Sequence, residues 1–136
     1  MDTIAEFRIW SIGTVESSIT NTQDAPHQDN EGAPEAWLVI DRAFATGLED
    51  IKPNQEIWLL TWFHLAERDV LKVHPKNDHN RPLAGVFSTR SPSRPNPIGL
   101  HRVRVLEVAG GNRLRVDHLD ALHGTPIIDL KPVLDQ

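Results

Sequence analysis

Two arginines and an asparagine lie close together in a proline-rich stretch, Gly85 to Leu100, and such side chains bind anionic or polar ligands. Arg90, Arg94 and Asn96 alternate there with three prolines. Each proline fixes φ, removes a backbone donor and restricts the preceding residue to extended conformations. The stretch therefore predicts a rigid extended loop, and a loop that is ordered before its ligand arrives loses less entropy on binding. A purely structural turn between strands is the alternative interpretation.

Two segments of the sequence are motifs that can be compared with known families. Residues 89–100 read Thr-Arg-Ser-Pro-Ser-Arg-Pro-Asn-Pro-Ile-Gly-Leu, and residues 119–132 read Leu-Asp-Ala-Leu-His-Gly-Thr-Pro-Ile-Ile-Asp-Leu-Lys-Pro. Together they resemble the TrmO family, also called TsaA-like or YaeB-like, whose members are S-adenosylmethionine-dependent tRNA methyltransferases. The resemblance runs from residue 12 to residue 132. It implies a single-domain YaeB-like β-barrel over residues 1–136, S-adenosylmethionine as cofactor, tRNA as partner and a homodimer.

The resemblance also assigns a cofactor site to several separate parts of the chain. Arg90 is expected to hold the methionine carboxylate, and Asp120 to accept a hydrogen bond from a ribose hydroxyl or the ammonium group. Backbone groups beside Leu100 are expected to contact an adenine edge. The residues implied for the cofactor are Pro26, His27, Gln28, His64, Leu65, Arg90, Leu100, Asp120, Ala121, Leu122 and His123.

The chemistry that the resemblance implies is methyl transfer to the exocyclic nitrogen of threonylcarbamoyl-adenosine beside the tRNA anticodon. Displacement from a sulfonium depends mainly on alignment of the acceptor behind the methyl carbon. A base must also take the proton of the amine. Asp120, His64 and His123 are the candidates for this base, and the sequence does not choose among them. For His64, which follows an apolar strand, a structural role is the more common alternative. Arg94 and Asn96 are expected to contact the substrate.

Several classes of site are not predicted by this sequence. The absence of cysteine excludes disulfides, thiolate metal sites and thiol nucleophiles. No Gly-x-Gly-x-x-Gly follows an expected strand, so the doubly wound sheet of conventional methyltransferases is not expected. His64, His74 and His79 lack the spacing and the carboxylate of a known metal site, so no metal is expected. Without a long apolar run or a signal segment, the chain is expected to be cytoplasmic and free of membrane spans.

Charge is distributed unevenly along the chain. Residues 72–115 contain nine basic and two acidic side chains, a local net charge of +7. Because the whole chain carries −5, the remainder carries −12. This asymmetry predicts one face that can approach a polyanion such as tRNA. A charge-balanced surface between two copies of the chain is the alternative.

The elements that must hold these residues are predicted to be short β-strands with few short helices. Apolar residues alternate or run continuously between clusters of Gly, Pro, Asn and Asp, which is typical of a mainly β, barrel-like domain. The strands are expected at residues 4–15, 35–41, 55–65, 70–73, 99–108, 113–116 and 127–130, with a half-strand at 86–87.

The connections between these strands also carry clear signals. Residues 17–34 form a long polar loop of the kind that is usually functional or disordered. Residues 42–50 predict a short helical turn, and Gly110-Gly111-Asn112 predicts a tight hairpin turn. Within the strand at 99–108, alternation is expected to point Leu100, Val103 and Val105 inward and Arg102 and Arg104 outward.

Some residues depart from the family pattern near the implied site. Leu65, His123 and Val133 stand where the family usually has an amide, an aspartate and an aromatic residue. The loop at 24–35 is acidic, whereas a loop that faces tRNA is expected to be basic. These features favour a second interpretation, an S-adenosylmethionine-binding protein that acts on a small molecule or as a sensor. A β-rich binding module without cofactor is a third.

Overall fold

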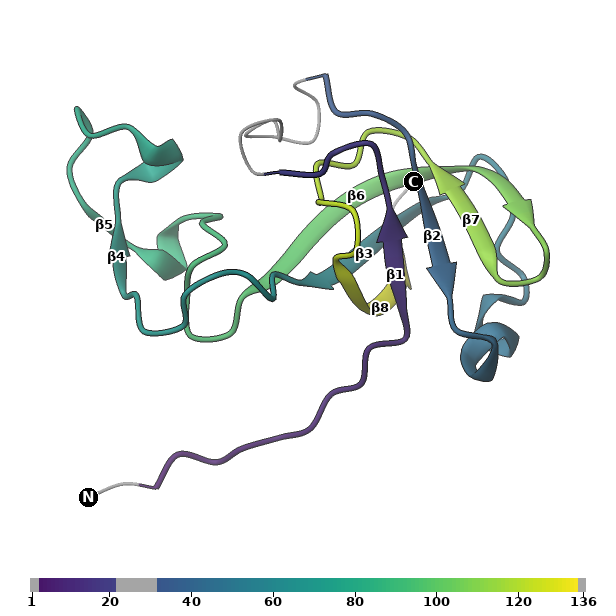
Figure 1. The fold of residues 1–136 in the computed structure, drawn as a ribbon, viewed down its shortest axis with the longest axis horizontal. Helices are drawn as coiled ribbons and strands as arrows, with labels where there is room; N and C mark the ends of the chain where they lie inside the picture. The colour runs from purple at the N-terminus through teal and green to yellow at the C-terminus, as the bar shows by residue number, and fades with distance from the viewer. Residues whose placement is uncertain (1–2, 22–31, 135–136) are drawn as a thin grey trace.

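Six antiparallel strands close into a barrel in the computed structural model, which describes residues 3–21 and 32–134 (Figure 1). Around the barrel the order is β1-β2-β7-β6-β3-β8, while β4 and β5 pair only with each other. The strands are β1 (Gly13–Glu16), β2 (Ala36–Ile40), β3 (Glu56–Trp62), β4 (Lys72–Val73), β5 (Ala84–Gly85), β6 (Ile98–Ala109), β7 (Arg113–Val116) and β8 (Pro126–Pro132). Three short 3-10 helices are η1 (Arg42–Leu48), η2 (Pro75–Asn77) and η3 (Val86–Ser88). The mainly β prediction is confirmed.

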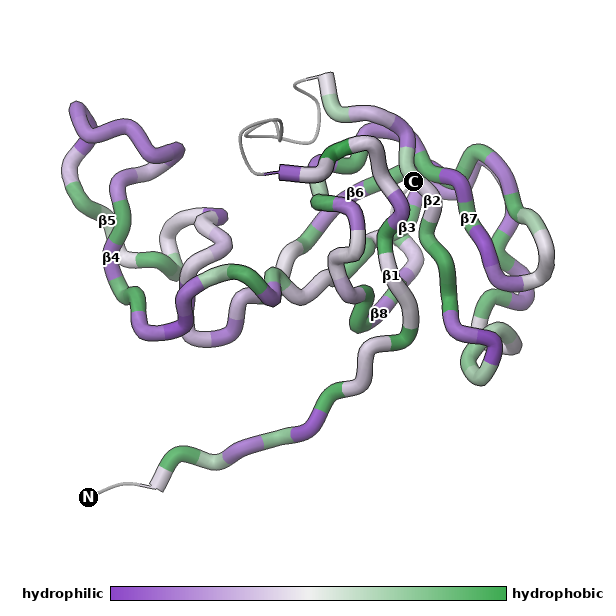
Figure 2. The backbone as a smooth tube through the Cα atoms, viewed as in Figure 1, coloured by the Kyte–Doolittle hydropathy of each residue, from purple (hydrophilic) through white to green (hydrophobic). Residues whose placement is uncertain are grey.

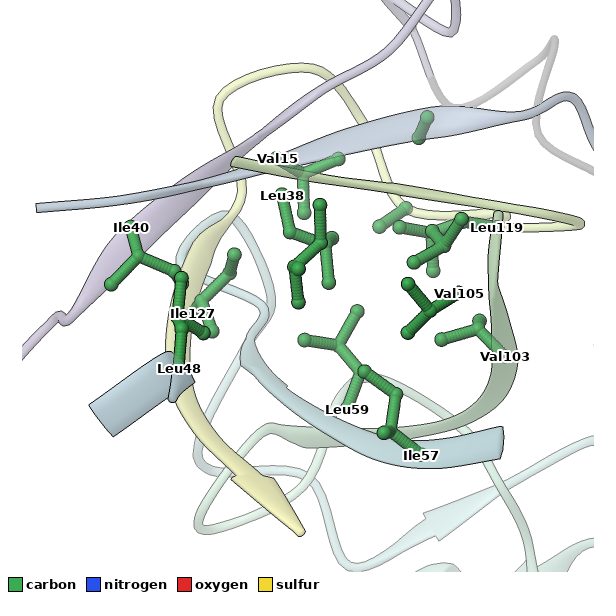
Figure 3. Close-up of a cluster of buried hydrophobic side chains, with 14 residues drawn as sticks. Val15, Leu38, Ile40, Leu48, Ile57, Leu59, Val103, Val105, Leu119 and Ile127 are labelled. Carbon is green, nitrogen blue, oxygen red and sulfur yellow. The ribbon is translucent and has the colours of Figure 1, made fainter. Parts of the chain in front are cut away.

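The barrel is filled by aliphatic side chains. Successive residues of a strand point to opposite faces, so every second residue of β2, β3 and β7 is buried. Each fully buried aliphatic side chain stabilises the fold by about 1.5–3 kcal/mol relative to its exposed state. Figure 3 shows this cluster, which includes Val15, Leu38, Leu59, Val105 and Leu119.

A segment that we call the excursion, residues 63–97, projects from the barrel between β3 and β6 (Figure 1). Trp62 and Ile98, which flank it, are paired in the β3–β6 ladder. The Phe63 amide donates a hydrogen bond to the Pro97 carbonyl at 2.8 Å, so the two chain segments stay together as they leave the barrel. Figure 2 shows hydrophilic residues along the outer end of the excursion. The proline-rich stretch belongs to the excursion and is held at the start of β6.

The predicted hairpin turn is confirmed between β6 and β7. Gly110 and Gly111 have φ values of 63° and 77°, in the left-handed region that glycine adopts without steric cost. The Asn112 side-chain amide donates a hydrogen bond to the Ile40 carbonyl at 2.9 Å, and this contact is buried. The turn is therefore fixed to the neighbouring strand β2.

Most of the other predicted elements are confirmed, with small differences at their ends. The strands expected at 35–41, 55–65, 99–108, 113–116 and 127–130 correspond to β2, β3, β6, β7 and β8, and the turn at 42–50 corresponds to η1. The strand expected at 70–73 is reduced to Lys72–Val73. No helix in the described parts of the chain is long and apolar enough to cross a bilayer.

The expected strand at 4–15 is wrong over most of its length, because β1 begins only at Gly13. Residues 3–11, which we call the arm, extend away from the barrel without pairing to a strand, and Phe7 is 89% exposed (Figure 1). Near the barrel, the Trp10 ring stacks on Phe44 of η1 with centroids 6.4 Å apart. An alternating sequence becomes a strand only where a neighbouring strand completes its backbone hydrogen bonds. In the described chain, β1 already pairs with β2 on one side and β8 on the other, which closes the barrel. The arm therefore has no strand edge to pair with.

The half-strand at 86–87 is also wrong, because these residues lie in the 3-10 turn η3 and Phe87 is 79% exposed. The Thr89 amide donates to the Val86 carbonyl at 3.0 Å, which turns the chain where an extended strand was expected. The inward position of Leu100 is wrong as well. In β6 the buried residues are Gly99, His101, Val103 and Val105, so Leu100 shares the outer face with Arg102 and Arg104.

Candidate functional site

The excursion and the barrel enclose an open hollow of about 1400 Å³. Its lining combines the proline-rich stretch, the first residues of β6, the β4–β5 hairpin and one residue from the segment after β7. A concave site that joins apolar surface with a few polar groups is the usual form of a small-molecule site. The residues that line it include Lys72, His74, Arg90, Ile98, Leu100, His101 and Asp120.

The proline-rich stretch is held in shape by the Arg94 guanidinium. Its two terminal nitrogens donate hydrogen bonds to the carbonyls of Val86 at 2.8 Å, Ser91 at 2.9 Å and Thr89 at 3.0 Å. Hydrogen bonds from a charged donor are stronger than neutral ones. The predicted rigidity of this loop therefore has two sources, the prolines and an internal arginine. The sequence-based expectation that Arg94 contacts the substrate is not tested by these contacts.

A second arginine, Arg68, holds the other end of the stretch. Its Nε donates to the Pro95 carbonyl at 2.7 Å, and its Nη2 donates to Oδ1 of Asn96 at 3.0 Å. The same guanidinium lies 5.2 Å from the centre of the Trp62 ring, which is within cation–π range. Asn96 is thus oriented by a residue that the sequence interpretation had not considered.

Arg90 differs from both of these arginines. It is exposed, it lines the hollow, and within the described residues no carboxylate or carbonyl pairs with its guanidinium. Its cationic group is therefore available to a ligand with an anionic group.

Asp120 reaches the same hollow from a distant part of the sequence. Its Oδ1 lies 3.1 Å from Nδ1 of His101, and Nε2 of His101 lies 2.9 Å from Oγ1 of Thr61. Thr61 is 0% exposed and His101 is 3% exposed, so the row of polar groups begins in the barrel interior. The Phe63 ring meets the His101 ring edge-on, with centroids 6.0 Å apart.

The sequence interpretation missed Thr61 and His101, although a signal was present. In the strand at 99–108, His101 has the same parity as Val103 and Val105, so strict alternation already assigned it to the interior. Thr61 likewise follows Ile57 and Leu59 at intervals of two. A histidine and a threonine at inward positions of adjacent strands indicate a buried hydrogen bond.

The other predicted cofactor residues do not all meet at this hollow. Arg90, Leu100 and Asp120 line it together, whereas His64 and Leu65 lie in the exposed turn after β3, and Leu65 is 73% exposed. Ala121 is buried in the core and Leu122 is half-buried. The expected residues Pro26, His27 and Gln28 lie outside the described residues.

His123 lies at a second, smaller hollow of about 410 Å³, next to Ser17, Glu35 and Arg115. Its Nδ1 accepts a hydrogen bond from the Ser17 amide at 3.2 Å. Within a single chain, therefore, His123 and Asp120 line different hollows, although they are only three residues apart in the sequence. The rings of His74 and His79 are 4.5 Å apart, but the described part of the chain contains no group of three residues able to hold a metal ion.

Charge on the barrel surface is largely neutralised by ion pairs. Glu56 of β3 accepts hydrogen bonds from Arg102 at 2.7 Å and Arg104 at 3.1 Å, and the bond from Arg102 lowers the pKa of Glu56 below its ordinary value. Two further arginines of the basic segment are paired with Glu16, Glu35 and Glu107: they are Arg113 and Arg115. The basic character predicted for residues 72–115 is thereby concentrated on the excursion.

Comparison with known proteins identifies relatives of this chain. The family model described as the tRNA-methyltransferase O N-terminal domain matches residues 14–136. A probable S-adenosyl-L-methionine-binding protein of Methanothermobacter thermautotrophicus is 43% identical over 127 residues, covering 93% of this chain and 90% of that protein. An S-adenosyl-L-methionine-binding protein of Archaeoglobus fulgidus is 45% identical over 120 residues, covering 88% and 84% of the two chains.

The solved structures lead to the same group of proteins. The crystal structure of TrmO from Pseudomonas aeruginosa matches 96% of this chain with a TM-score of 0.74 and 30% sequence identity. A second crystal structure of TrmO matches with a TM-score of 0.76 and 32% identity. The present chain covers 57% and 58% of those two chains, so it spans just over half of their length.

The three carbonyl contacts of Arg94 lead to a prediction about the loop. We expect Arg94→Ala to loosen residues 86–93, because three charge-assisted hydrogen bonds are lost at once, and to speed amide hydrogen exchange there by at least about tenfold. Hydrogen exchange read by mass spectrometry measures this. Arg42→Ala, an exposed arginine in η1, is the matched control. Exchange as slow as in the unchanged protein would show that the prolines alone hold the loop.

Proposed function

This chain belongs to the TrmO family, and we propose on that basis that it methylates N6 of threonylcarbamoyl-adenosine beside a tRNA anticodon, using S-adenosylmethionine. The observation that supports the proposal most directly is that Arg90, Leu100 and Asp120 line one hollow. These residues come from two segments that are separated in sequence and that both belong to the family motifs. The curated relatives are named for binding S-adenosylmethionine, which is the cofactor of the proposed reaction.

The chemistry of the hollow fits such a cofactor. The Arg90 guanidinium is available for a carboxylate, the Asp120 carboxylate for an ammonium or ribose hydroxyl, and Leu100 and Ile98 supply apolar surface. When bound, S-adenosylmethionine supplies an activated methyl group on a sulfonium sulfur. The chain's own task is to align the acceptor amine with that group and to take its proton.

Among the three base candidates, the hollow favours Asp120. Its carboxylate lines the hollow, whereas His64 and His123 are not among the lining residues of that hollow in the described chain. As the base, the Asp120 carboxylate accepts the proton that the acceptor nitrogen loses, and this role is the alternative to its contact with the ammonium or ribose of the cofactor. The basic excursion, with Lys72, Lys76 and Arg90, is the proposed contact for tRNA phosphates.

The second candidate function keeps the cofactor but not the tRNA. The pairing of barrel arginines with Glu56, Glu16, Glu35 and Glu107 leaves less free positive charge than the sequence suggested. This observation favours an S-adenosylmethionine-binding protein that acts on a small molecule or as a sensor. The two functions share the hollow and differ in the acceptor.

We also propose that the protein forms a homodimer, as the family resemblance implies. The exposed apolar side chains of the arm and excursion, such as Phe7 and Phe87, are consistent with a partner surface. Light scattering is expected to give a mass near twice 15.3 kDa. A mass of one chain at micromolar concentration would contradict the dimer.

We expect Arg90→Ala to weaken S-adenosylmethionine binding at least about tenfold, because a charge-assisted hydrogen bond to the carboxylate is lost. Isothermal titration calorimetry measures the affinity. Arg42→Ala is again the matched control and is expected to bind as the unchanged protein does. Its site in η1 lies at the end of the barrel away from the excursion (Figure 1). Unchanged affinity in Arg90→Ala would remove Arg90 from the site.

The methyl acceptor is tested with methyl-labelled S-adenosylmethionine and total tRNA. We expect label to enter the RNA and, after nuclease digestion, to migrate with the N6-methylated nucleoside. tRNA that lacks the threonylcarbamoyl group is the matched control and is expected to stay unlabelled. If the cofactor binds but no RNA is labelled, the sensor or small-molecule function is the correct one.

A further inference from the structure

A row of three polar side chains in contact, Thr61, His101 and Asp120, leads from the barrel interior to the hollow. We propose that His101 is a positioning residue that holds the Asp120 carboxylate in place as an acceptor facing the hollow, with Thr61 fixing the orientation of the His101 ring. The distances are 3.1 Å from His101 Nδ1 to Asp120 Oδ1 and 2.9 Å from His101 Nε2 to Thr61 Oγ1. The role of Asp120 as an acceptor for a ligand in the hollow rests on the function proposed above, whereas the contacts among Thr61, His101 and Asp120 do not.

The burial of the row increases gradually toward the core. The Asp120 side chain is 20% exposed, the His101 side chain is 4% exposed, and Thr61 is fully buried. Asp120 is therefore the member best placed to meet a ligand, and His101 acts through it. A buried imidazole without partners would be costly, so the two contacts of His101 satisfy a physical requirement as well.

The partners of His101 determine which ring nitrogen carries the proton. Oδ1 of Asp120 lies 3.1 Å from Nδ1, and a carboxylate can only accept, so we assign the ring proton to Nδ1. Nε2 is then the nitrogen that can accept from the Thr61 hydroxyl, 2.9 Å away. The His101 ring behind the carboxylate limits the rotation of that carboxylate. This restraint suits a group that must accept a hydrogen bond or a proton from a ligand.

The barrel leaves room for this arrangement at Gly99. Gly99 faces Thr61 across the β3–β6 ladder, and a Cβ at Gly99 would lie 2.6 Å from Cζ of Phe63 and would also collide with Thr61 Oγ1. The absence of a side chain at Gly99 allows Thr61 to reach His101. The Phe63 ring packs edge-on against the imidazole, with centroids 6.0 Å apart. His101 is thus restrained by packing as well as by its contacts with Thr61 and Asp120.

The test compares two substitutions that each keep one end of the row. In His101→Asn the amide nitrogen lies near the position of Nδ1 and can donate to Asp120. In His101→Gln the longer side chain extends toward Thr61 and leaves Asp120 without this donor. We expect His101→Asn to bind S-adenosylmethionine within about threefold of the unchanged protein, and His101→Gln to bind at least about tenfold more weakly.

Thermal unfolding of both variants without ligand provides the structural comparison. A purely structural His101 would lower the melting temperature of both variants and leave their affinities equal, and that result would overturn the proposal. If either variant fails to fold, the ring nitrogens of His101 decide instead, by ¹⁵N NMR of the unchanged protein and of Asp120→Asn. We expect a protonated Nδ1 whose resonance shifts in Asp120→Asn, and an unshifted resonance would overturn the proposal.

The same NMR measurement separates this proposal from the proposed function. It needs no cofactor, so a protein that fails to bind S-adenosylmethionine still reports whether Asp120 and His101 are joined. Absence of binding with a shifted Nδ1 resonance would refute the cofactor function and support the row of contacts. Binding with an unshifted resonance would do the opposite.

Discussion

The register between β3 and β6 is the constraint on which the site depends. Seven consecutive residue pairs join the strands, and among them Leu59 faces His101 and Thr61 faces Gly99. A slip of one residue would turn His101 and Val103 to the surface and Arg102 into the core. The apolar core therefore fixes the positions of two polar side chains that contribute little to it. In this barrel, packing of the apolar core sets the strand register, and the register determines where Thr61, His101 and Asp120 reach the hollow.

The sequence predicted the parts of the site that depend on local chemistry. Three prolines were enough to predict a rigid loop, and alternation predicted β6 and β7 because each has a neighbouring strand to complete it. Arg90 and Asp120 were expected from the family motifs, and they line one hollow. Cofactor contact by these residues remains a prediction, as do the roles of Arg94 and Asn96.

The features that the sequence did not predict depend on long-range contacts. Residues 4–11 have the alternation of a strand but no paired strand in the described chain, so pattern alone was misleading. The partners of Arg68 and the contact between Thr61 and His101 join residues that are 27 to 40 positions apart. The surface charge also depends on long-range contacts. Arg104, Arg113 and Arg115 of β6 and β7 pair with Glu56, Glu16 and Glu35, three acids that lie outside residues 72–115 and were not included in the local count.

The excursion leaves and rejoins the barrel at one hydrogen-bonded pair of residues, Trp62 and Ile98. Closure of the barrel is therefore independent of the length and composition of the loop inserted there, as long as that pair is kept. The side chains that fill the barrel core all lie outside residues 63–97. Substitutions at the exposed positions of that segment are therefore expected to alter the lining of the hollow with little effect on the stability of the barrel.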